Sequence, residues 1–411
     1  MSAAIAATGT AAKLLQYRSE VNGELEAILS WWSEYMIDEE DGGFKGSVKN
    51  DNLPDTSADK GIVLNSRILW TFSSAYSFTK EKTYLGIATR AFEYILHHFI
   101  DHKHGGVFWS VDAKGERKNA KKQVYGLAFT IYGMAEYFKV TGEGEALHLA
   151  KDLYERIEQY SFDDSKGGYI EAFSDDWSAI GDLRLSEKDD NEKKTMNTHL
   201  HIIEAYANLY TVWPDKKLRE KIAALLELFD RYIINKANHH LHLFMDEGWN
   251  VRSSLISFGH DIEAAWLLLE CAEATGYQSY IDQYKKISVE LTGVAMQGLD
   301  TDGGLWYEYD PAKDHWTREK HSWPQAEAMV GFFNAWQLTG DEKYLQYSQD
   351  SFDFIKTHIK DHEKGEWFWG IEEDGTVMQK EKAGFWKCPY HSSRACMEIM
   401  KRVDTQLKHR G

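Results

Sequence analysis

Three histidines stand at the starts of apolar segments that are far apart in the chain. His201 lies in NTHLHIIEAYANLY, His260 in SFGHDIEAAWLLLE and His391 in CPYHSSRACMEIM. Histidine has the ordinary pKa nearest neutrality, so its imidazole can take up and return protons at physiological pH. A single histidine at a helix start is more often a cap or a satisfied core residue, but three in equivalent positions favour a shared proton-transfer site.

Arg67 adds a positive charge that such a site can use. It lies in VLNSRILWTF, ahead of another apolar run, and a guanidinium stabilises an oxyanion that develops during proton transfer. Glu263 lies three residues after His260, on the same face of a helix, where it could orient that imidazole and raise its basicity. Six apolar segments carry a polar or aromatic residue at their start, namely Arg67, Tyr125, His201, His260, Trp323 with Glu327, and His391.

A weak repeat organises the chain between these segments. It consists of an acidic or charged cluster, Gly-Gly or a related pair, and then aromatic or β-branched residues, which together predict a short β-hairpin. The repeats follow one another at intervals of roughly 62 to 73 residues, and such a period indicates a repeat architecture. The segment near His240 takes the fourth place without the glycines. The other five repeats centre on Gly42, Gly105, Gly167, Gly303 and Gly365.

Two helices fit between successive hairpins. One is amphipathic, as in EKTYLGIATRAFEYILHHF, and the other is apolar almost all round, as in GLAFTIYGMAEYF. An amphipathic helix keeps one face in water, whereas an apolar helix must be buried. Six such pairs predict an all-α fold, an (α/α)6 barrel with an inner ring of apolar helices and short β-hairpins at one end. An open helical solenoid is the alternative, but six units that fill the chain without a polar capping repeat favour closure.

In a closed barrel of alternating helices, the starts of all six inner helices lie at the same end. Residues from Arg67 to His391 would then line one cavity. Helix N-termini add unpaired N–H groups and a partial positive charge, which lower the pKa of a nearby histidine and favour an oxyanion. The sequence therefore predicts one proton-transfer cavity at that end of the barrel.

The composition indicates which kinds of partner to exclude and which cellular compartment to expect. The net charge of −18 argues against nucleic acid, whose phosphates would be repelled. No stretch of about 18 apolar residues is present, and no basic leader precedes an apolar core, so we expect neither a membrane span nor a secretory signal. Three scattered cysteines favour reduced thiols in the cytoplasm. We expect residues 1–15 to form a disordered tail, residues 16–411 to form a single catalytic domain, and the protein to be a monomer.

A metal site is the less favoured interpretation of the histidines. His199 and His201 are two residues apart, and on a helix such neighbours point about 200° apart. No cysteine or carboxylate pattern of a zinc site accompanies them. We therefore expect no metal, and we expect His199 to pack or to cap. His239, His240 and His242 fall in a predicted hairpin and are expected to be a solvated surface run.

Two tryptophans indicate the kind of ligand. Trp323 and Trp386 stand just before inner helices, where an aromatic face can stack on a sugar ring. Cys388 and Cys396 flank His391, and we expect both to be small buried residues rather than nucleophiles.

Five segments carry a resemblance to a known family. From about residue 20 to the C-terminus the chain resembles the N-acylglucosamine 2-epimerase superfamily, whose fold is the (α/α)6 barrel. The resemblance is nearest to the branch that converts the reducing-end glucose of cellobiose or lactose to mannose without a metal or redox cofactor. It implies an epimerase with no cofactor, acting on a small oligosaccharide. The segments are LNSRILWTF, MNTHLHIIEAYANLY, SFGHDIEAAWLLLE, HSWPQAEAMVGFFNA and FWKCPYHSSRAC.

The resemblance also implies roles for individual residues. His260 in FGHDIE and His391 in PYHSSR would be the acid/base pair, and His201 would assist at the substrate oxygens. Arg67 would bind the developing oxyanion, with Glu263 in support. We take His391 as the base at carbon 2 and His260 as the partner in ring opening. The substrate-binding residues that the resemblance implies are Tyr125, Asn197, Trp323, Glu327, Trp386 and Asp189, the last two for the distal sugar.

Three alternative functions remain open at this point. An aldose–ketose isomerase would share the enediolate and differ in the carbon to which the proton returns. A glycoside hydrolase needs two carboxylates across the scissile bond, and Glu263, Glu327 and Asp189 are the candidates. A binding protein without catalysis would have no need of three aligned histidines and Arg67.

Overall fold

Helices of two kinds alternate along the chain. The computed structural model describes the backbone of residues 2–410 and the side chains of residues 9–408. The first kind is buried almost all round and comprises α2 (Ile62–Thr79), α4 (Val124–Thr141), α6 (Met196–Val212), α8 (Phe258–Thr275), α10 (Ser322–Thr339) and α12 (Tyr390–Arg410). The second kind comprises α1 (Ser2–Tyr35), α3 (Lys82–Tyr94), α5 (Gly144–Arg156), α7 (Lys216–Leu228), α9 (Gln278–Ala295) and α11 (Glu342–Phe354).

The difference between the two kinds follows from their sequences. In α4, every residue from Val124 to Tyr137 is buried. In α3, the buried residues are confined to one face, which includes Ile87, Ala88 and Ala91. The amphipathic helices therefore have one wet face, and the apolar helices have none, as the sequence predicts.

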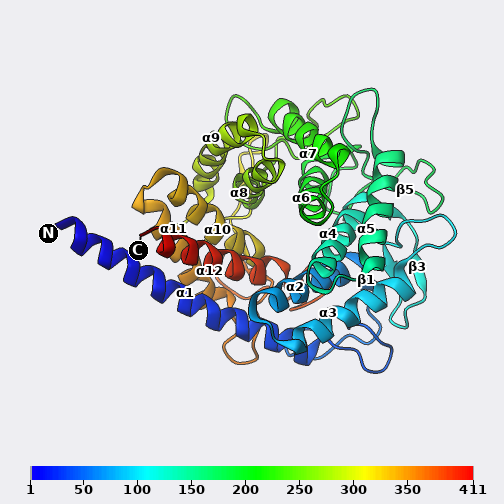
Figure 1. Cartoon of the computed structure of the whole chain (residues 1–411), viewed down its shortest axis with the longest axis horizontal. Helices are drawn as coiled ribbons and strands as arrows, with labels where there is room; N and C mark the ends of the chain where they lie inside the picture. The colour runs from blue at the N-terminus through cyan, green and yellow to red at the C-terminus, as the bar shows by residue number, and fades with distance from the viewer. Residues whose placement is uncertain (1, 411) are drawn as a thin grey trace.

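The six apolar helices form a closed inner ring. Each packs against the next in chain order, and α12 packs against α2. The amphipathic helices lie outside, each against the inner helix that precedes it, and α1 packs along α12, so the first and last helices make the sixth pair (Figure 1). One cluster of buried hydrophobic side chains extends from Leu14 to Val403. The (α/α)6 barrel is confirmed, and the open solenoid is wrong.

Short strands join neighbouring repeats at one end of the barrel. The strand directly before an inner helix pairs, antiparallel, with a strand that follows the next turn in the chain. The strands are β1 (Lys60–Gly61), β2 (Ser110–Val111), β3 (Arg117–Asn119), β4 (Lys122–Gln123), β5 (Ala172–Phe173), β6 (Lys194–Thr195), β7 (Phe244–Met245), β8 (Ile256–Ser257), β9 (Glu308–Asp310), β10 (His315–Thr317), β11 (Lys320–His321) and β12 (Gly370–Ile371). The pairs are β1–β2, β4–β5, β6–β7, β8–β9 and β11–β12, with β3 added to β2 and β10 to β9. Five inner helices, α2, α4, α6, α8 and α10, therefore begin at a point that a neighbouring repeat holds in place.

The six turns of the repeat share a bridge between the residues that flank them. The fourth turn, which lacks the glycines, has the same antiparallel bridge, between Ile234 and Leu241. The segment near His240 therefore does fill the fourth place of the repeat. In Gly43, φ is +62° and a Cβ would lie 2.5 Å from the Tyr94 ring, which explains the glycine there. The other bridges are Ile37–Phe44, Ile100–Val107, Phe162–Tyr169, Leu299–Leu305 and Lys360–Trp367.

An ion pair between a buried lysine and an aspartate of the turn is present in five of these turns. Lys122 Nζ lies 2.6 Å from Asp101 Oδ2, and both side chains are at most 3% exposed. Asp101 also accepts the N–H groups of Lys103 and His104, so one carboxylate organises the whole turn. The equivalent pairs are Lys60–Asp38, Lys194–Asp163, Lys320–Asp300 and Lys382–Asp361. In the fourth repeat Ile256 and Asn235 occupy the two positions, so both charges are absent together.

The N-terminal segment is helical in this structure. Helix α1 runs without a break from Ser2, and Leu14 is already fully buried. Disorder at residues 1–15 stays a prediction, as does the assignment of residues 16–411 to one domain. No helix within the described residues is long and apolar enough to cross a membrane.

Replacing Lys122 by methionine should destabilise the barrel, because Asp101 would be left as a buried charge without a partner. We expect the free energy of unfolding to fall by about 3–5 kcal/mol, measured by urea denaturation. Lys118→Met removes the exposed partner of Asp59 and should leave the denaturation midpoint nearly unchanged. Equal stability of the two variants would show that the buried pair does not hold the turn.

Candidate active site

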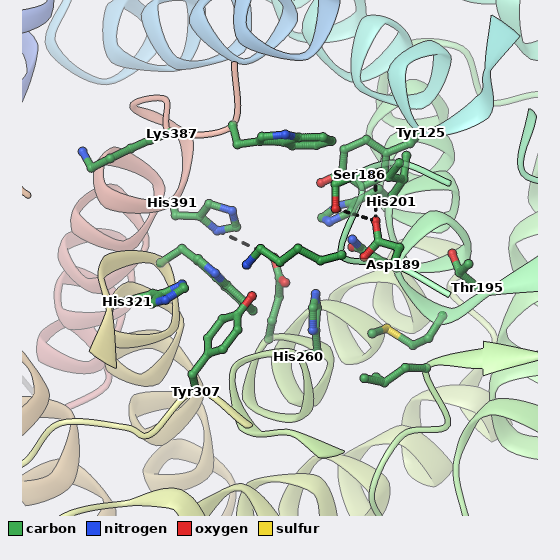
Figure 2. Close-up of a pocket in the computed structure, with 18 of the residues that line it drawn as sticks. Tyr125, Ser186, Asp189, Thr195, His201, His260, Tyr307, His321, Lys387 and His391 are labelled. Carbon is green, nitrogen blue, oxygen red and sulfur yellow. Dashed lines mark hydrogen bonds and ion pairs between the residues drawn. The ribbon is translucent and has the colours of Figure 1, made fainter. Parts of the chain in front are cut away.

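The N-terminal ends of the inner helices surround a cavity of about 530 Å³. Figure 2 shows Tyr125, His201, His260 and His391 pointing into it from four different helices. All but one of the predicted site residues line this cavity, namely Arg67, Tyr125, Asp189, Asn197, His201, His260, Glu263, Trp323, Trp386 and His391. Glu327 lies beneath the cavity wall and contacts the lining through His391. The predicted convergence of distant residues is therefore present.

The segment SFGHDIE positions His260 through its neighbours. Asp261 accepts the Leu241 N–H at 3.0 Å and contacts His240 Nδ1 at 2.6 Å, so it ties the fourth turn to the start of α8. A Cβ on Gly259 would lie 2.6 Å from the Trp323 ring, so glycine permits the close approach of that tryptophan. His260 is then left facing the cavity with its ring 4.8 Å from Trp323.

This arrangement corrects two of our expectations. His240 is buried against Asp261 rather than part of a solvated run, because the fourth turn uses it in place of the missing ion pair. Glu263 does not orient His260, since His260 Nδ1 lies 2.8 Å from Ser257 Oγ, at the residue three positions before it. Glu263 instead lies 3.8 Å from His391 Nδ1.

Carboxylates hold the other two histidines from below. His391 Nδ1 lies 2.6 Å from Glu327 Oε1, and His201 Nδ1 lies 2.8 Å from Glu204 Oε2. A carboxylate can only accept, so it assigns the ring proton to Nδ1 and leaves Nε2 with a free lone pair. His391 and His201 can therefore each present a proton acceptor to the cavity.

Burial keeps the imidazoles neutral. It lowers the pKa of His260 to about 3 and also lowers the pKa of His201. Burial and the charges of Arg67 and Arg394 hold the pKa of His391 well below its ordinary value. At neutral pH these side chains are therefore bases rather than cations.

One guanidinium binds the carboxylates together. Arg394 donates to Glu204 at 2.6 Å, to Glu263 at 2.9 Å and to Glu327 at 2.6 Å. Burial raises the pKa of Glu204, but the Arg394 charge and the hydrogen bond from His201 outweigh it and lower that pKa to about 2. Glu204 is therefore ionised beneath His201.

Glu263 and Glu327 both hold a proton more tightly than an exposed carboxyl does. Burial and then repulsion by Glu327 raise the pKa of Glu263 to about 8, and burial also raises the pKa of Glu327. Glu327 accepts hydrogen bonds from His391, Arg394 and the Trp266 indole. Glu263 accepts one, from Arg394, within the part of the chain that the structure describes. Because hydrogen bonds favour the anion, Glu263 takes up a proton more readily than Glu327 does.

Arg67 is placed differently from Arg394. Its Nη2 donates to Tyr125 OH at 2.7 Å, and its guanidinium lies 4.1 Å from the centre of the Phe129 ring. No carboxylate of the described residues forms an ion pair with it, and its Nε is buried without a partner. Arg67 therefore brings an uncompensated positive charge to the cavity wall, which suits an oxyanion.

Comparison with known proteins agrees with this geometry. Residues 42–395 match the N-acylglucosamine 2-epimerase (GlcNAc 2-epimerase) family. The chain belongs to this family. A cellobiose 2-epimerase of Bacteroides fragilis is 44% identical over 93% of this chain and 98% of its own, and one of Dictyoglomus turgidum is 36% identical over 92% and 96%. The solved structure of cellobiose 2-epimerase from Bacillus thermoamylovorans superposes with a TM-score of 0.90, at 38% identity, over 94% of this chain and 99% of that one.

The family resemblance did not reveal the residues that act behind the cavity wall. Glu204 and Arg394 went unpredicted, although each lies three residues after a histidine of the site, on the same helical face. A charged residue inside an otherwise apolar inner helix was the available signal. Other lining residues that sequence reasoning missed or left undecided are Glu171, Lys188, Tyr307, Glu308, His321, Trp367, Trp369, Lys380, Lys387 and Cys388.

The outer part of the cavity is built from a loop and from hairpins. Asp189 Oδ2 accepts the Ser186 N–H at 2.8 Å and its hydroxyl at 2.9 Å, which fixes the carboxylate on this loop (Figure 2). Tyr307 and His321 stack with ring centres 3.9 Å apart. The Asn197 Oδ1 atom is buried without a partner, so a ligand hydroxyl could donate to it.

A cation already occupies the place where a metal would fit best. Glu263, Glu327 and His391 offer ligand atoms within 4.8 Å of one another, but Arg394 Nη2 donates to both carboxylates. His199 cannot offer a nitrogen, because Nε2 accepts the Tyr169 N–H and Nδ1 contacts the Thr195 carbonyl. The expectation that His199 caps or packs is confirmed.

Because their pKa values are strongly lowered by burial, His260 and His391 should stay neutral from about pH 6 to pH 8, in contrast to a solvent-exposed histidine, and His201 should titrate below the ordinary midpoint. The Cε1–H resonances of His260 and His391 in an NMR titration should stay fixed over this range. Single glutamine variants at the three positions assign the resonances. A midpoint near 6.5 for His260 would show that it is not desolvated.

Proposed function

We propose that this protein is a cofactor-independent cellobiose 2-epimerase, which inverts carbon 2 of the reducing-end glucose and yields mannose there. Family membership and the relatives from Bacteroides fragilis and Dictyoglomus turgidum support this substrate. The observation that carries the chemistry is the meeting of two neutral imidazoles, His260 and His391, with the uncompensated charge of Arg67.

The reaction begins with ring opening. His260 transfers the proton of the anomeric hydroxyl to the ring oxygen, and the open chain then has an aldehyde at carbon 1. His201, with its Nδ1 proton held by Glu204, assists at the substrate oxygens. Tyr125 and Asn197 contact the reacting sugar at the same level of the cavity.

Proton transfer at carbon 2 follows. His391 Nε2 removes that proton, and Glu327 stabilises the imidazolium through its hydrogen bond to Nδ1. Arg67 holds the enediolate oxygens, which carry the electron pair left by the C–H bond. Rotation about the bond between carbons 2 and 3 turns the other face to the imidazolium, which returns the proton and gives the epimer. Glu263 supports this step from beneath through Arg394.

Aromatic faces hold the disaccharide. Trp323 lies against both His260 and His391, with ring centres 4.8 Å and 5.5 Å away, so it contacts the reacting sugar. Trp386 and Asp189 bind the distal glucose, the first by stacking and the second through its fixed carboxylate. Lactose differs only in the distal sugar, and we include it as a substrate. We further propose that the enzyme acts as a monomer in the cytoplasm, in keeping with its three free cysteines.

The three carboxylates considered for a hydrolase are all engaged by other residues of the protein. Glu263 and Glu327 are both held by Arg394 beneath the histidines, and Asp189 is engaged by Ser186. A hydrolase needs one carboxyl on each side of the scissile bond, free to give a proton or to attack.

Incubation of cellobiose with the protein in heavy water, with a chelator present, tests the proposed function. We expect deuterium at carbon 2 of the reducing sugar, and glucosyl-mannose as the product observed by NMR. A keto sugar with deuterium at carbon 1 would instead identify an isomerase. Free glucose would identify a hydrolase, and recovery of unchanged cellobiose without deuterium would indicate a binding protein.

Removal of either imidazole should abolish most of the activity. We expect His391→Ala and His260→Ala to lower kcat by about 10²–10⁴-fold, because each removes a proton carrier. His315→Ala changes an exposed residue of β10 and serves as the matched control with normal activity. Near-normal epimerisation by either cavity variant would reject the role given to that residue.

A further inference from the structure

Arg394 lies beneath the cavity, at a point that four inner helices share. It belongs to α12, and its partners are Glu204 of α6, Glu263 of α8 and Glu327 of α10. The Arg394 side chain is 3% exposed, and the three glutamate side chains are at most 5% exposed. All four charged groups are therefore removed from water and depend on one another.

Two of these contacts continue to a histidine of the cavity. Glu204 reaches His201 through its second oxygen, and Glu327 reaches His391 through the same oxygen that Arg394 contacts. Among the described residues, no hydrogen bond joins Arg394 to either imidazole. Arg394 can therefore orient the histidines only through the carboxylates, although its charge also lowers the pKa of both imidazoles directly.

We propose that Arg394 is a positioning residue for the epimerisation, a proposal that rests on the proposed function. By keeping Glu204 and Glu327 fixed and ionised, Arg394 keeps the ring proton of His201 and His391 on Nδ1. The Nε2 atom of each imidazole is then left as the acceptor that faces the sugar.

The charges around Arg394 explain why its loss would matter. Three carboxyls meet one guanidinium, so the cluster has an excess of acidic groups even with Arg394 in place. Without it, burial and mutual repulsion would raise the pKa of Glu327 and Glu204 until each takes up a proton. The titratable groups that face Arg394 are Tyr132 from α4, His201 and Glu204 from α6, Glu263 and Glu270 from α8, Glu327 from α10, and Tyr390, His391 and Glu398 from α12.

A protonated Glu327 would change the tautomer of His391. The carboxyl O–H would donate to Nδ1, and the ring proton would move to Nε2, where it blocks acceptance of a proton from carbon 2. The same exchange would occur between Glu204 and His201. Catalysis would then recover only at a pH high enough to ionise the carboxyls again.

The variants Arg394→Met and Arg394→Lys test this role. We expect Arg394→Met to lower kcat by about 10²–10⁴-fold with little change in KM, since the wrong tautomer forms but the sugar contacts remain. The acidic limb of the profile of kcat against pH should move to higher pH. Arg394→Lys keeps the charge but loses the two-armed contact, so its kcat and its acidic limb should lie between those of the other two proteins.

Arg402→Met is the matched control. Arg402 lies two turns further along α12, pairs with Glu270 at 3.0 Å and packs, like Arg394, on the Trp266 ring. Its glutamate partners, Glu270 and Glu398, contact no histidine within the described residues. We expect Arg402→Met to lower the unfolding temperature but to leave the pH profile in place.

The tautomers can be measured without substrate. Nitrogen-15 NMR of His201 and His391 should show Nδ1–H in the wild type and Nε2–H in Arg394→Met. If the wild type does not epimerise cellobiose, the proposed function fails, and this measurement still tests the positioning role. Unchanged tautomers or an unmoved acidic limb in a folded Arg394 variant would overturn the proposal, as would an equal shift in Arg402→Met. If Arg394→Met does not fold, the same two readouts in Arg394→Lys decide.

Discussion

The burial of polar groups inside a closed ring of apolar helices is the constraint on which this structure depends. An inner helix has no wet face, so a charged side chain deep within it needs partners inside the barrel, and Arg394 finds its carboxylate partners on other inner helices. Glu204, Glu263 and Glu327 come from three helices and meet Arg394 of a fourth. The contact therefore exists only when α12 closes the ring against α10 and α2. The charged cluster beneath the cavity therefore depends on the closure of the barrel.

The short strands and turns, which lie outside the ring, hold the inner helices in the positions that these contacts need. A strand directly before each of five inner helices is paired with the turn region of the next repeat, and a buried lysine such as Lys122 is anchored on a turn aspartate such as Asp101. These links fix where those five helices begin, and Arg67, Tyr125, His201, His260 and Trp323 lie within their first two turns. In the fourth repeat, the His240–Asp261 contact takes over from the absent ion pair. The helix that carries His260 is therefore still tied to its turn.

The sequence was sufficient for those features that a single segment encodes. Periodicity distinguishes inner from outer helices, and polar residues ahead of apolar runs identify the mouth of the cavity. It was insufficient wherever a residue's role depends on a partner from another segment. The spacing of His260 and Glu263 predicts a contact, but Ser257 is nearer, and Glu263 turns instead toward Arg394. Arg394 lies in a quoted motif, yet its function depends on glutamates from three other helices, which no local pattern specifies.

Two buried arginines near one cavity illustrate how partners decide the use of a charge. The charge of Arg394 is fully used by carboxylates, which leaves little positive potential for a ligand. Arg67 has a phenol, a thiol and aromatic faces around it instead, and these cannot neutralise it. In the proposed reaction, negative charge develops on the sugar only after carbon 2 loses its proton, so a cation with no resident anion stabilises that state more than the neutral substrate. If Arg67 had the carboxylate partners that Arg394 has, it would no longer stabilise the charged state more than the neutral substrate. The side chains that line the cavity would be the same, so the partners of an arginine decide its use.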